Sequence, residues 1–255
     1  MTPRPRFPFL DHPGPIAFAH RGGGAEAEEN THAAIAHAVG LGFRYIETDV
    51  QATRDGVAVL FHDADLARIT GSPGRIADLA FAELSARRTL GGEPIPRLDA
   101  MLEAFPDIRF NLEPKTEAAV APLAEAVARL SAIDRVCVGC FDEGRTRRVR
   151  ALLGERLCWS PSRLGVARAW LAGFGLPVGS LAFPVLQVPR RSGVEIVTRR
   201  FLAAAHARGI AVHVWTIDEE AEMERLLDLG VDGVMTGRPS VLARVLARRG
   251  AWPAR

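Results

Sequence analysis

Short apolar runs of strand length alternate with helical segments along most of the chain. Eight such runs can be counted, at residues 16–20, 45–50, 108–114, 135–140, 157–160, 184–189, 211–217 and 231–237. Strands joined through a helix run parallel in one sheet, and eight parallel strands are the number that closes an α/β barrel. The pattern therefore predicts the α/β class and a TIM (β/α)8 barrel. No linker or internal repeat divides the 255 residues, so we expect a single domain, 1–255.

The second run continues into a hairpin, in the stretch YIETDVQATRDGVAVLFHD at residues 45–63. The turn RDG is far too short for a parallel crossover, so the returning arm pairs antiparallel and carries His62 back. Side chains alternate faces along a strand, which puts Glu47 and Asp49 on one face. Two adjacent carboxylates on an apolar strand are costly to bury unless a cation lies between them. The alternative is a surface hairpin with a solvated acidic edge.

Residues 64–107 interrupt the regular alternation. They contain short helical pieces and the loop GGEP, but no further run that the sheet needs. We expect a small insertion at the barrel rim, directly after the second-strand hairpin. The alternation of strands and helices resumes at residue 108.

Charged and aromatic residues collect where the predicted strands end. Active sites of α/β barrels lie at the C-terminal ends of the strands, where the following loops share one rim. These ends and the hairpin supply three carboxylates, two histidines, two cationic side chains and a tryptophan, namely Glu47, Asp49, Glu113, His20, His62, Arg21, Lys115 and Trp215. An ion pair that closes the mouth of the barrel is the structural alternative.

The residue types in this set suit one kind of chemistry. Three carboxylates are hard oxygen ligands for Mg²⁺ or Ca²⁺. Arg21 and Lys115, the only lysine of the chain, add positive charge that fits a phosphate. Two histidines can share the general base and general acid roles near neutral pH. The set predicts cleavage of a phosphate ester by metal-assisted phosphoryl transfer.

Several motifs resemble one known family. The segments AHRGG…EENT, IETDVQATRDGVAVLFHD, NLEPK, VHVWT and DLGVDGVMTGRP are similar, in the same order, to those of glycerophosphodiester phosphodiesterases. The likeness covers nearly the whole chain and is weakest between residues 152 and 194. It implies a barrel with an insertion after the HD motif, and a divalent-metal-dependent hydrolysis of a small-molecule phosphodiester that releases an alcohol and glycerol 3-phosphate.

The resemblance also implies a role for each matching position. His20 and His62 would be the acid–base pair. Glu47, Asp49 and Glu113 would hold the metal, while Arg21 and Lys115 would hold the phosphate. Trp215 would line the polyol pocket, and Glu29 would orient these groups beside Asn30. The sequence departs from the family pattern at Glu28, Cys140 and Gly237, where a proline, a serine and an aspartate are usual.

Two other functions stay open. The opening HRGG…ENT is similar to the lysophospholipase D branch of the family, which implies cleavage of lysophospholipids to lysophosphatidic acid. Residues 169–188 carry no charge, and their glycines and prolines argue against a spanning helix. One expectation is an apolar loop at 173–183, beside the phosphate site, that receives an acyl chain and contacts lipid peripherally. The alternative is that this run packs in the barrel wall. The second function left open is that of a catalytically silent barrel that only binds phosphodiesters.

Composition adds a few limits. The net charge of +2, with 24% charged residues, calls for no nucleic-acid partner. The opening MTPRPRFPFLDHPGP has no apolar core for a secretory signal, so we expect a cytoplasmic protein. Cys137 and Cys140 are interpreted as small core residues, and His213 as a packing residue of the barrel interior. The sequence specifies no oligomeric state.

Overall fold

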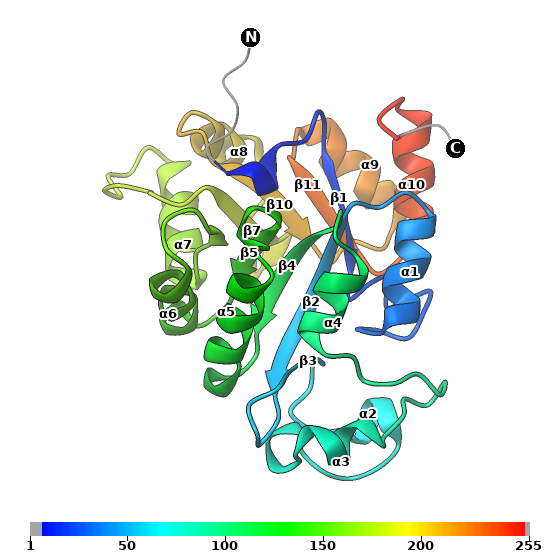
Figure 1. Cartoon of the computed structure of the whole chain (residues 1–255). Coiled ribbons are helices and arrows are strands. Elements are labelled where there is room, and N and C mark those ends of the chain that lie inside the picture. Colours follow the sequence, from blue (N-terminus) through cyan, green and yellow to red (C-terminus); the bar gives the residue numbers. More distant parts are fainter. Residues whose placement is uncertain (1–6, 253–255) are drawn as a thin grey trace.

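The computed structural model describes residues 7–252 and shows the predicted barrel (Figure 1). Its parallel strands lie in the order β6-β5-β4-β2-β1-β11-β10-β7. Their bounds are β1 Ile16–His20, β2 Tyr45–Ala52, β4 Arg109–Pro114, β5 Val136–Gly139, β6 Cys158–Ser160, β7 Val185–Pro189, β10 Ala211–Trp215 and β11 Gly233–Thr236. Strands β6 and β7 meet through a side chain, because Gln187 N donates to Ser160 Oγ at 3.0 Å. The eight strands thus form a nearly closed barrel.

Strand register fixes which side chains meet at the rim. Strand β3 (Ala58–Leu60) pairs antiparallel with β2, as the hairpin prediction requires. Strand β4 pairs parallel with β2 on its other side, with Asp49 opposite Glu113. Residues opposite each other in a sheet point to the same face, so carboxylates that are distant in sequence are brought together.

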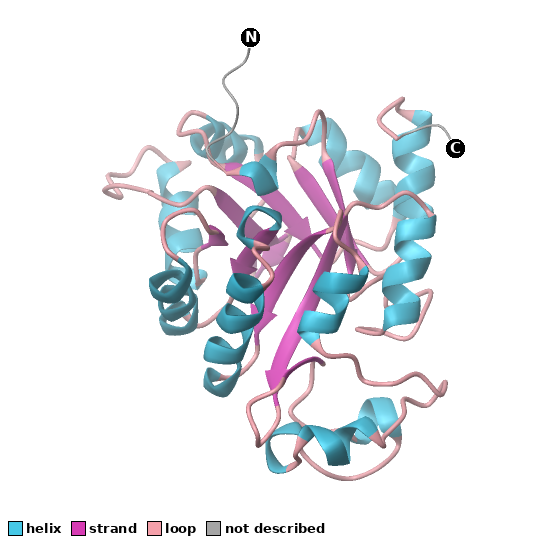
Figure 2. Ribbon diagram, viewed as in Figure 1, coloured by secondary structure: helices cyan, strands magenta, loops and turns pink. Residues whose placement is uncertain are grey.

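Helices surround the strands (Figure 2). They are α1 His32–Gly40, α4 Leu98–Ala104, α5 Val120–Arg129, α6 Glu143–Leu153, α7 Arg163–Ala172, α8 Arg199–His206, α9 Glu220–Leu229 and α10 Pro239–Arg248. Side-chain caps mark several starts, because Thr31 Oγ1 accepts from Ala34 N and Asp142 Oδ1 accepts from Arg145 N, both at 3.1 Å. Within residues 7–252, no helix has the length and apolar character needed to cross a membrane.

The insertion is shorter than predicted. Helix α4 lies within the expected range 64–107, yet its Leu98, Met101 and Leu102 pack in the main core of the barrel. The helix is therefore part of the barrel wall, on the crossover from β2 to β4. The inserted segment before it holds α2 (Ala67–Thr70) and α3 (Phe81–Ser85). It has a small apolar core of its own, built on Val59, Phe61, Leu66, Ile76, Leu84 and Ile95.

Aromatic side chains fill the N-terminal end of the barrel interior. Phe9, Phe18 and Tyr45 pack there, and the Tyr45 hydroxyl donates to the Phe9 carbonyl at 2.9 Å. His213 is fully buried, with its ring 4.9 Å from that of Phe18, so its prediction as an interior packing residue is confirmed. Cys137 is a free, buried thiol in the same cluster. This packing leaves the C-terminal ends of the strands as the open side of the barrel.

Candidate active site

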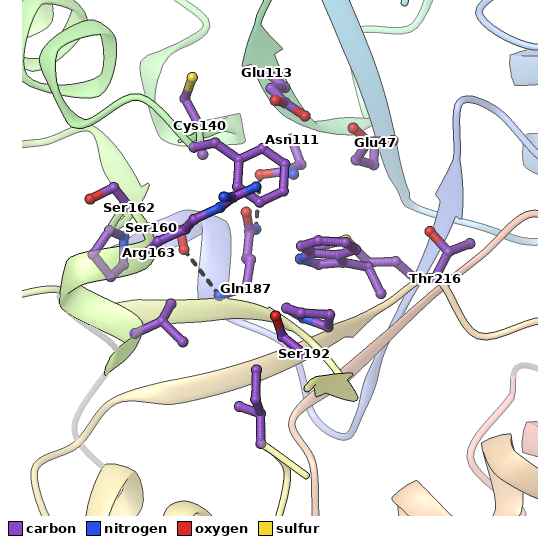
Figure 3. A pocket seen from close by; sticks show the side chains of 18 of the residues that line it. Glu47, Asn111, Glu113, Cys140, Ser160, Ser162, Arg163, Gln187, Ser192 and Thr216 are labelled. Atoms are coloured by element: carbon purple, nitrogen blue, oxygen red, sulfur yellow. Dashed lines mark hydrogen bonds between the residues drawn. The ribbon is translucent and has the colours of Figure 1, made fainter. Parts of the chain in front are cut away.

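A cavity of about 720 Å³ opens at the C-terminal ends of the strands. It is lined by all eight residues expected at this rim, His20, Arg21, Glu47, Asp49, His62, Glu113, Lys115 and Trp215. Figure 3 shows Glu47 and Glu113 on one side of this pocket and Ser160, Ser162 and Arg163 on the other. The barrel topology thus brings these eight residues, from four strands and three loops, to one site.

Three carboxylates form the centre of the site. Ligand oxygens of Glu47, Asp49 and Glu113 all lie within 4.8 Å of one another. Burial raises the pKa of Glu47 well above its usual range, and the charges of Asp49 and Glu113 raise it further. Burial also raises the pKa of Glu113, while the Lys115 ammonium opposes that rise. These hard oxygen donors, two buried and one half-buried, fit a divalent cation, which would relieve the repulsion that the carboxylates impose on one another.

Two cationic side chains flank the carboxylates. Arg21 Nε lies 3.1 Å from Asp49 Oδ2, and Lys115 Nζ lies 3.4 Å from Asp49 Oδ1. Lys115 Nζ is also 3.3 Å from Glu113 Oε1. A planar guanidinium and a compact ammonium therefore stand on either side of the proposed metal-binding group. An incoming phosphate would meet both positive charges.

Backbone strain marks the loop that follows β1. Arg21 and Asn30 have positive φ values, 54° and 60°, a conformation that is uncommon outside glycine. In this conformation Arg21 N donates to Glu47 Oε2 at 3.1 Å. The Asn30 amide donates to Asp49 Oδ2 at 3.0 Å and accepts from Thr48 Oγ1 at 2.6 Å. The strained loop thus holds two of the three carboxylates in place.

The two histidines lie in different surroundings. His20 Nε2 is 3.6 Å from Glu47 Oε2, and burial, aided by the charge of Arg21, lowers the pKa of His20 to about 4. His62 is less buried, and its Nδ1 is 2.6 Å from Asp63 Oδ1. A hydrogen bond from Arg68 lowers the pKa of Asp63 to about 2, which keeps this partner of His62 ionised. A carboxylate on one ring nitrogen fixes the orientation of the imidazole and leaves the other nitrogen available for proton transfer.

Sequence reasoning missed how the insertion contacts the site. Arg68, on α2, donates to both oxygens of Glu29 and to Asp63, while Glu29 accepts from Arg21 Nη1 at 3.0 Å. Glu28, which replaces the usual proline, accepts from Thr89 Oγ1 and from Gly91 N in the insertion. No periodic pattern in the sequence predicts these contacts. Their only sequence signal is a pair of glutamates before an expected turn.

The rest of the cavity is broader than predicted. Phe141 packs edge-on against Trp215, with ring centroids 5.6 Å apart, and the Arg163 guanidinium covers the Phe141 ring at 4.8 Å. Gln187 Nε2 donates to Asn111 Oδ1 at 2.9 Å on the cavity floor (Figure 3). Among the missed lining residues, Phe141 and Arg163 follow β5 and β6 and could have been found as strand-end positions.

The loop expected to receive an acyl chain lies elsewhere. No residue of 173–183 lines the cavity, so its predicted position beside the phosphate site is wrong. The apolar part of the wall is supplied instead by α7 and by the segment after β7, through Val166, Ala167, Trp170, Val194 and Ile196. Helix α7 lies along the cavity, since residues at intervals of three and four, from Arg163 to Trp170, line it. The chain leaves the cavity after this helix, so that 173–183 lies away from it.

Gly237, where the family usually has an aspartate, is contacted by the carboxylate of Asp218 from a neighbouring loop. Asp218 Oδ1 accepts from Gly237 N at 2.7 Å and from Thr236 Oγ1 at 2.9 Å. Cys140, the other departure at a strand end, lines the cavity, and its Sγ accepts from Asp142 N at 3.3 Å. Neither departure removes a residue of the carboxylate, histidine or cationic sets.

Comparisons with known proteins agree with this geometry. The family model of the glycerophosphoryl diester phosphodiesterase family matches residues 20–172 and 176–241. The Mycobacterium tuberculosis protein named "Probable glycerophosphodiester phosphodiesterase 2" is 40% identical, over 97% of both chains. Human lysophospholipase D GDPD1 is 28% identical over 88% of this chain and 83% of its own length.

Solved structures share the fold. An Oleispira antarctica phosphodiesterase, in complex with the product sn-glycerol-3-phosphate, superposes with a TM-score of 0.80 at 24% identity, covering 92% of this chain and 97% of that one. A glycerophosphodiester phosphodiesterase of Agrobacterium tumefaciens gives 0.77 at 24% identity, over 91% and 99%. By its matched residues and its relatives, the chain belongs to the glycerophosphoryl diester phosphodiesterase family.

Proposed function

We propose that the chain hydrolyses glycerophosphodiesters to an alcohol and glycerol 3-phosphate, with a divalent metal as cofactor. The observation that carries the proposal is the triad of Glu47, Asp49 and Glu113, whose oxygens lie within 4.8 Å in a cavity that two histidines share. The product seen in the Oleispira antarctica structure and the names of the relatives support the same substrate class. A barrel that only binds phosphodiesters would have no use for both histidines.

The three carboxylates would hold Mg²⁺ or Ca²⁺, both of which prefer oxygen ligands. When bound, the cation supplies Lewis-acid stabilisation of the charge on the phosphate oxygens. Arg21 and Lys115 bind the phosphate from its two sides, and Trp215 lines the place of the polyol. Glu29 and Asn30 orient Arg21 and Asp49 through the hydrogen bonds described above.

His20 and His62 divide the proton transfers between them. One takes the proton of the attacking hydroxyl, which in the family picture is the neighbouring glycerol hydroxyl, and the other protonates the leaving alcohol. Asp63 holds His62 through Nδ1, so Nε2 is the nitrogen that exchanges the proton. Water then opens the cyclic phosphate with the two roles reversed. Each histidine therefore acts once as a base and once as an acid.

A second substrate class is favoured by the apolar wall of the cavity. Val166, Trp170, Val194 and Ile196 offer a surface that a glycerol headgroup does not need. An acyl chain would occupy it, which would make lysophospholipids substrates and lysophosphatidic acid a product, as the names of the lysophospholipase D relatives suggest. Peripheral contact of 173–183 with lipid and a cytoplasmic location remain sequence predictions.

The test is an activity screen of the purified chain. Glycerophosphocholine, glycerophosphoethanolamine and a lysophospholipid are each assayed after dialysis against chelator, with Mg²⁺ or Ca²⁺ added back. We expect glycerol 3-phosphate from the first two substrates, and only with metal present. Full turnover in excess chelator would exclude the metal. Binding of all three substrates without turnover in either metal would identify a silent barrel.

A further inference from the structure

Exposed apolar side chains gather on one side of the molecule. The structure shows eight large hydrophobic side chains exposed among the described residues, and six of them lie on α7 or on segments next to it. These six are Phe141, Leu164, Leu171, Phe174, Leu176 and Val194, which we call the α7 face. The other two, Leu90 and Leu152, lie on the insertion and on α6. Such a cluster is unlike the scattered apolar residues of an ordinary surface.

Contacts join this face to the cavity. The Phe174 ring lies 4.5 Å from the Trp170 ring, and Trp170 lines the cavity. Trp170 Nε1 also donates to Glu195 O at 3.3 Å, in the hairpin of β8 (Arg191–Ser192) and β9 (Val194–Glu195). Leu164 and Leu171 are seven residues apart and so share one side of α7, next to the side that lines the cavity. The exposed stripe is therefore continuous with the apolar wall of the site.

Positive charge surrounds the same face. Four exposed arginines lie there, namely Arg163, Arg191, Arg199 and Arg200. None of them has a carboxylate oxygen within 4 Å among residues 7–252. The Arg200 guanidinium lies over the Phe174 ring, 5.3 Å from its centroid. Arginines on α10 are different, since Arg244 and Arg248 pair with glutamates of α9. The α7 face and the arginines around it thus combine exposed apolar groups with guanidinium groups that no carboxylate neutralises.

We propose that the α7 face docks on an anionic lipid bilayer and brings the mouth of the cavity against the membrane surface. The proposal rests on the proposed function and names where its lipid substrate enters. Leucine and phenylalanine side chains would enter the headgroup region, and the arginines would bind lipid phosphates. A symmetric contact between two copies fits less well, because it would bring the same four arginines together. A lysophospholipid would then lie with its acyl chain along Trp170 and Val194 and its phosphate at the phosphate site.

Vesicle binding tests the surface independently of turnover. The wild-type chain is sedimented with vesicles of phosphatidylcholine, with and without phosphatidylglycerol, at low and high salt. We expect binding that needs phosphatidylglycerol and weakens as salt rises. The triple variant Leu164→Gln/Leu171→Gln/Phe174→Gln should bind at least about tenfold more weakly, since it removes three apolar anchors. The matched control Leu90→Gln/Leu152→Gln removes the two exposed leucines elsewhere and should bind as wild type does.

A charge variant and two activity assays complete the test. Arg199→Gln/Arg200→Gln should weaken binding to the anionic vesicles and leave turnover of glycerophosphocholine unchanged, since neither residue lines the cavity. The triple variant should also keep that turnover, while turnover of vesicle-bound lysophospholipid falls. Wild-type chain that does not bind anionic vesicles, or equal loss in the triple variant and its control, would overturn the proposal. So would a dimer that the triple variant dissociates. Vesicle binding without any turnover would contradict the proposed function alone.

Discussion

Arg68 donates two hydrogen bonds to Glu29, at 2.7 and 3.1 Å, across 39 positions of the sequence. Its Nε donates a third, at 2.6 Å, to Asp63. Each carboxylate in turn holds one residue of the site, because Glu29 accepts from Arg21 and Asp63 lies against His62. A single guanidinium of the insertion thus orients the phosphate-binding side and the acid–base side together.

Replacing Arg68 with glutamine should lower kcat by about ten- to a hundredfold, the usual cost of losing such a supporting contact. KM should change less, because Arg21 and Lys115 stay in the cavity. The pKa of Asp63 would rise from about 2 towards its ordinary value, so the acid limb of the kcat–pH profile should move to higher pH. Steady-state kinetics from pH 3 to 9 measure both effects.

The control for this variant is Arg54→Gln. Arg54, in the turn between β2 and β3, pairs with Glu83 of the insertion at 2.9 Å but contacts no residue of the site. It should leave kcat and the pH profile unchanged. A wild-type profile in Arg68→Gln would show that Arg68 only stabilises the insertion.

Glu47→Gln separates metal binding from folding. Burial and two neighbouring carboxylates raise the pKa of Glu47, so a neutral isostere should relieve repulsion in the metal-free protein. We expect an unchanged or higher Tm without metal and a smaller rise in Tm when Mg²⁺ or Ca²⁺ is added, because less metal binds the folded state. Thermal unfolding with increasing metal measures this, with Glu117→Gln, an exposed carboxylate, as control. Equal metal-induced shifts in Glu47→Gln and wild type would remove Glu47 from the ligand set.

His20→Ala and His62→Ala should each reduce kcat by roughly a hundredfold or more, the usual contribution of a positioned acid or base. Substrate binding should change less, since the phosphate still meets Arg21 and Lys115. The control is His37→Ala, an exposed histidine of α1 that pairs with Glu26. Turnover is compared at saturating glycerophosphodiester and metal. Near-normal kcat in either variant would end the acid–base assignment of that histidine.

The parts of the fold that arise from a regular sequence pattern could be predicted from the sequence. Glu47 and Asp49 share a face because strand side chains alternate, and parallel pairing puts Glu113 opposite Asp49. The alternation of strands and helices likewise fixes the barrel and its active rim. Each of these inferences needs only local pattern and a topological rule, which is why they hold without knowledge of packing.

The parts that depend on irregular segments could not be predicted. Arg68 reaches Glu29 through an insertion whose short helices carry no period, and Glu28 reaches Gly91 across 63 positions. The course of α7 along the cavity depends on how its residues pack, so the sequence suggested the loop 173–183 as the apolar wall instead. Helix α4 falls within the predicted insertion for the same reason, since only its packing shows that it belongs to the barrel.

His213, which lies outside the active site, makes the free energy of unfolding depend on pH. Both its ring nitrogens are buried without a hydrogen-bond partner among the described residues, and burial lowers its pKa to about 3. The unfolded chain takes up a proton on this residue below about pH 6.5, but the folded chain does not until about pH 3. More protons are bound in the unfolded state across that window, so this residue makes the free energy of unfolding fall as pH falls.

His213→Met should remove that component, at about 1.4 kcal/mol for each pH unit below 6.5. It also removes a buried imidazole without partners, so the variant should be at least as stable as wild type at pH 8. Urea unfolding of both chains at pH 8, 7, 6 and 5 measures the difference, which should widen in favour of the variant as pH falls. His206→Met serves as control, because His206 is exposed beside Asp232 and its replacement should give no such widening. A difference between His213→Met and wild type that stays constant from pH 8 to 5 would mean that His213 titrates alike in both states, and that the barrel interior does not exclude its charge.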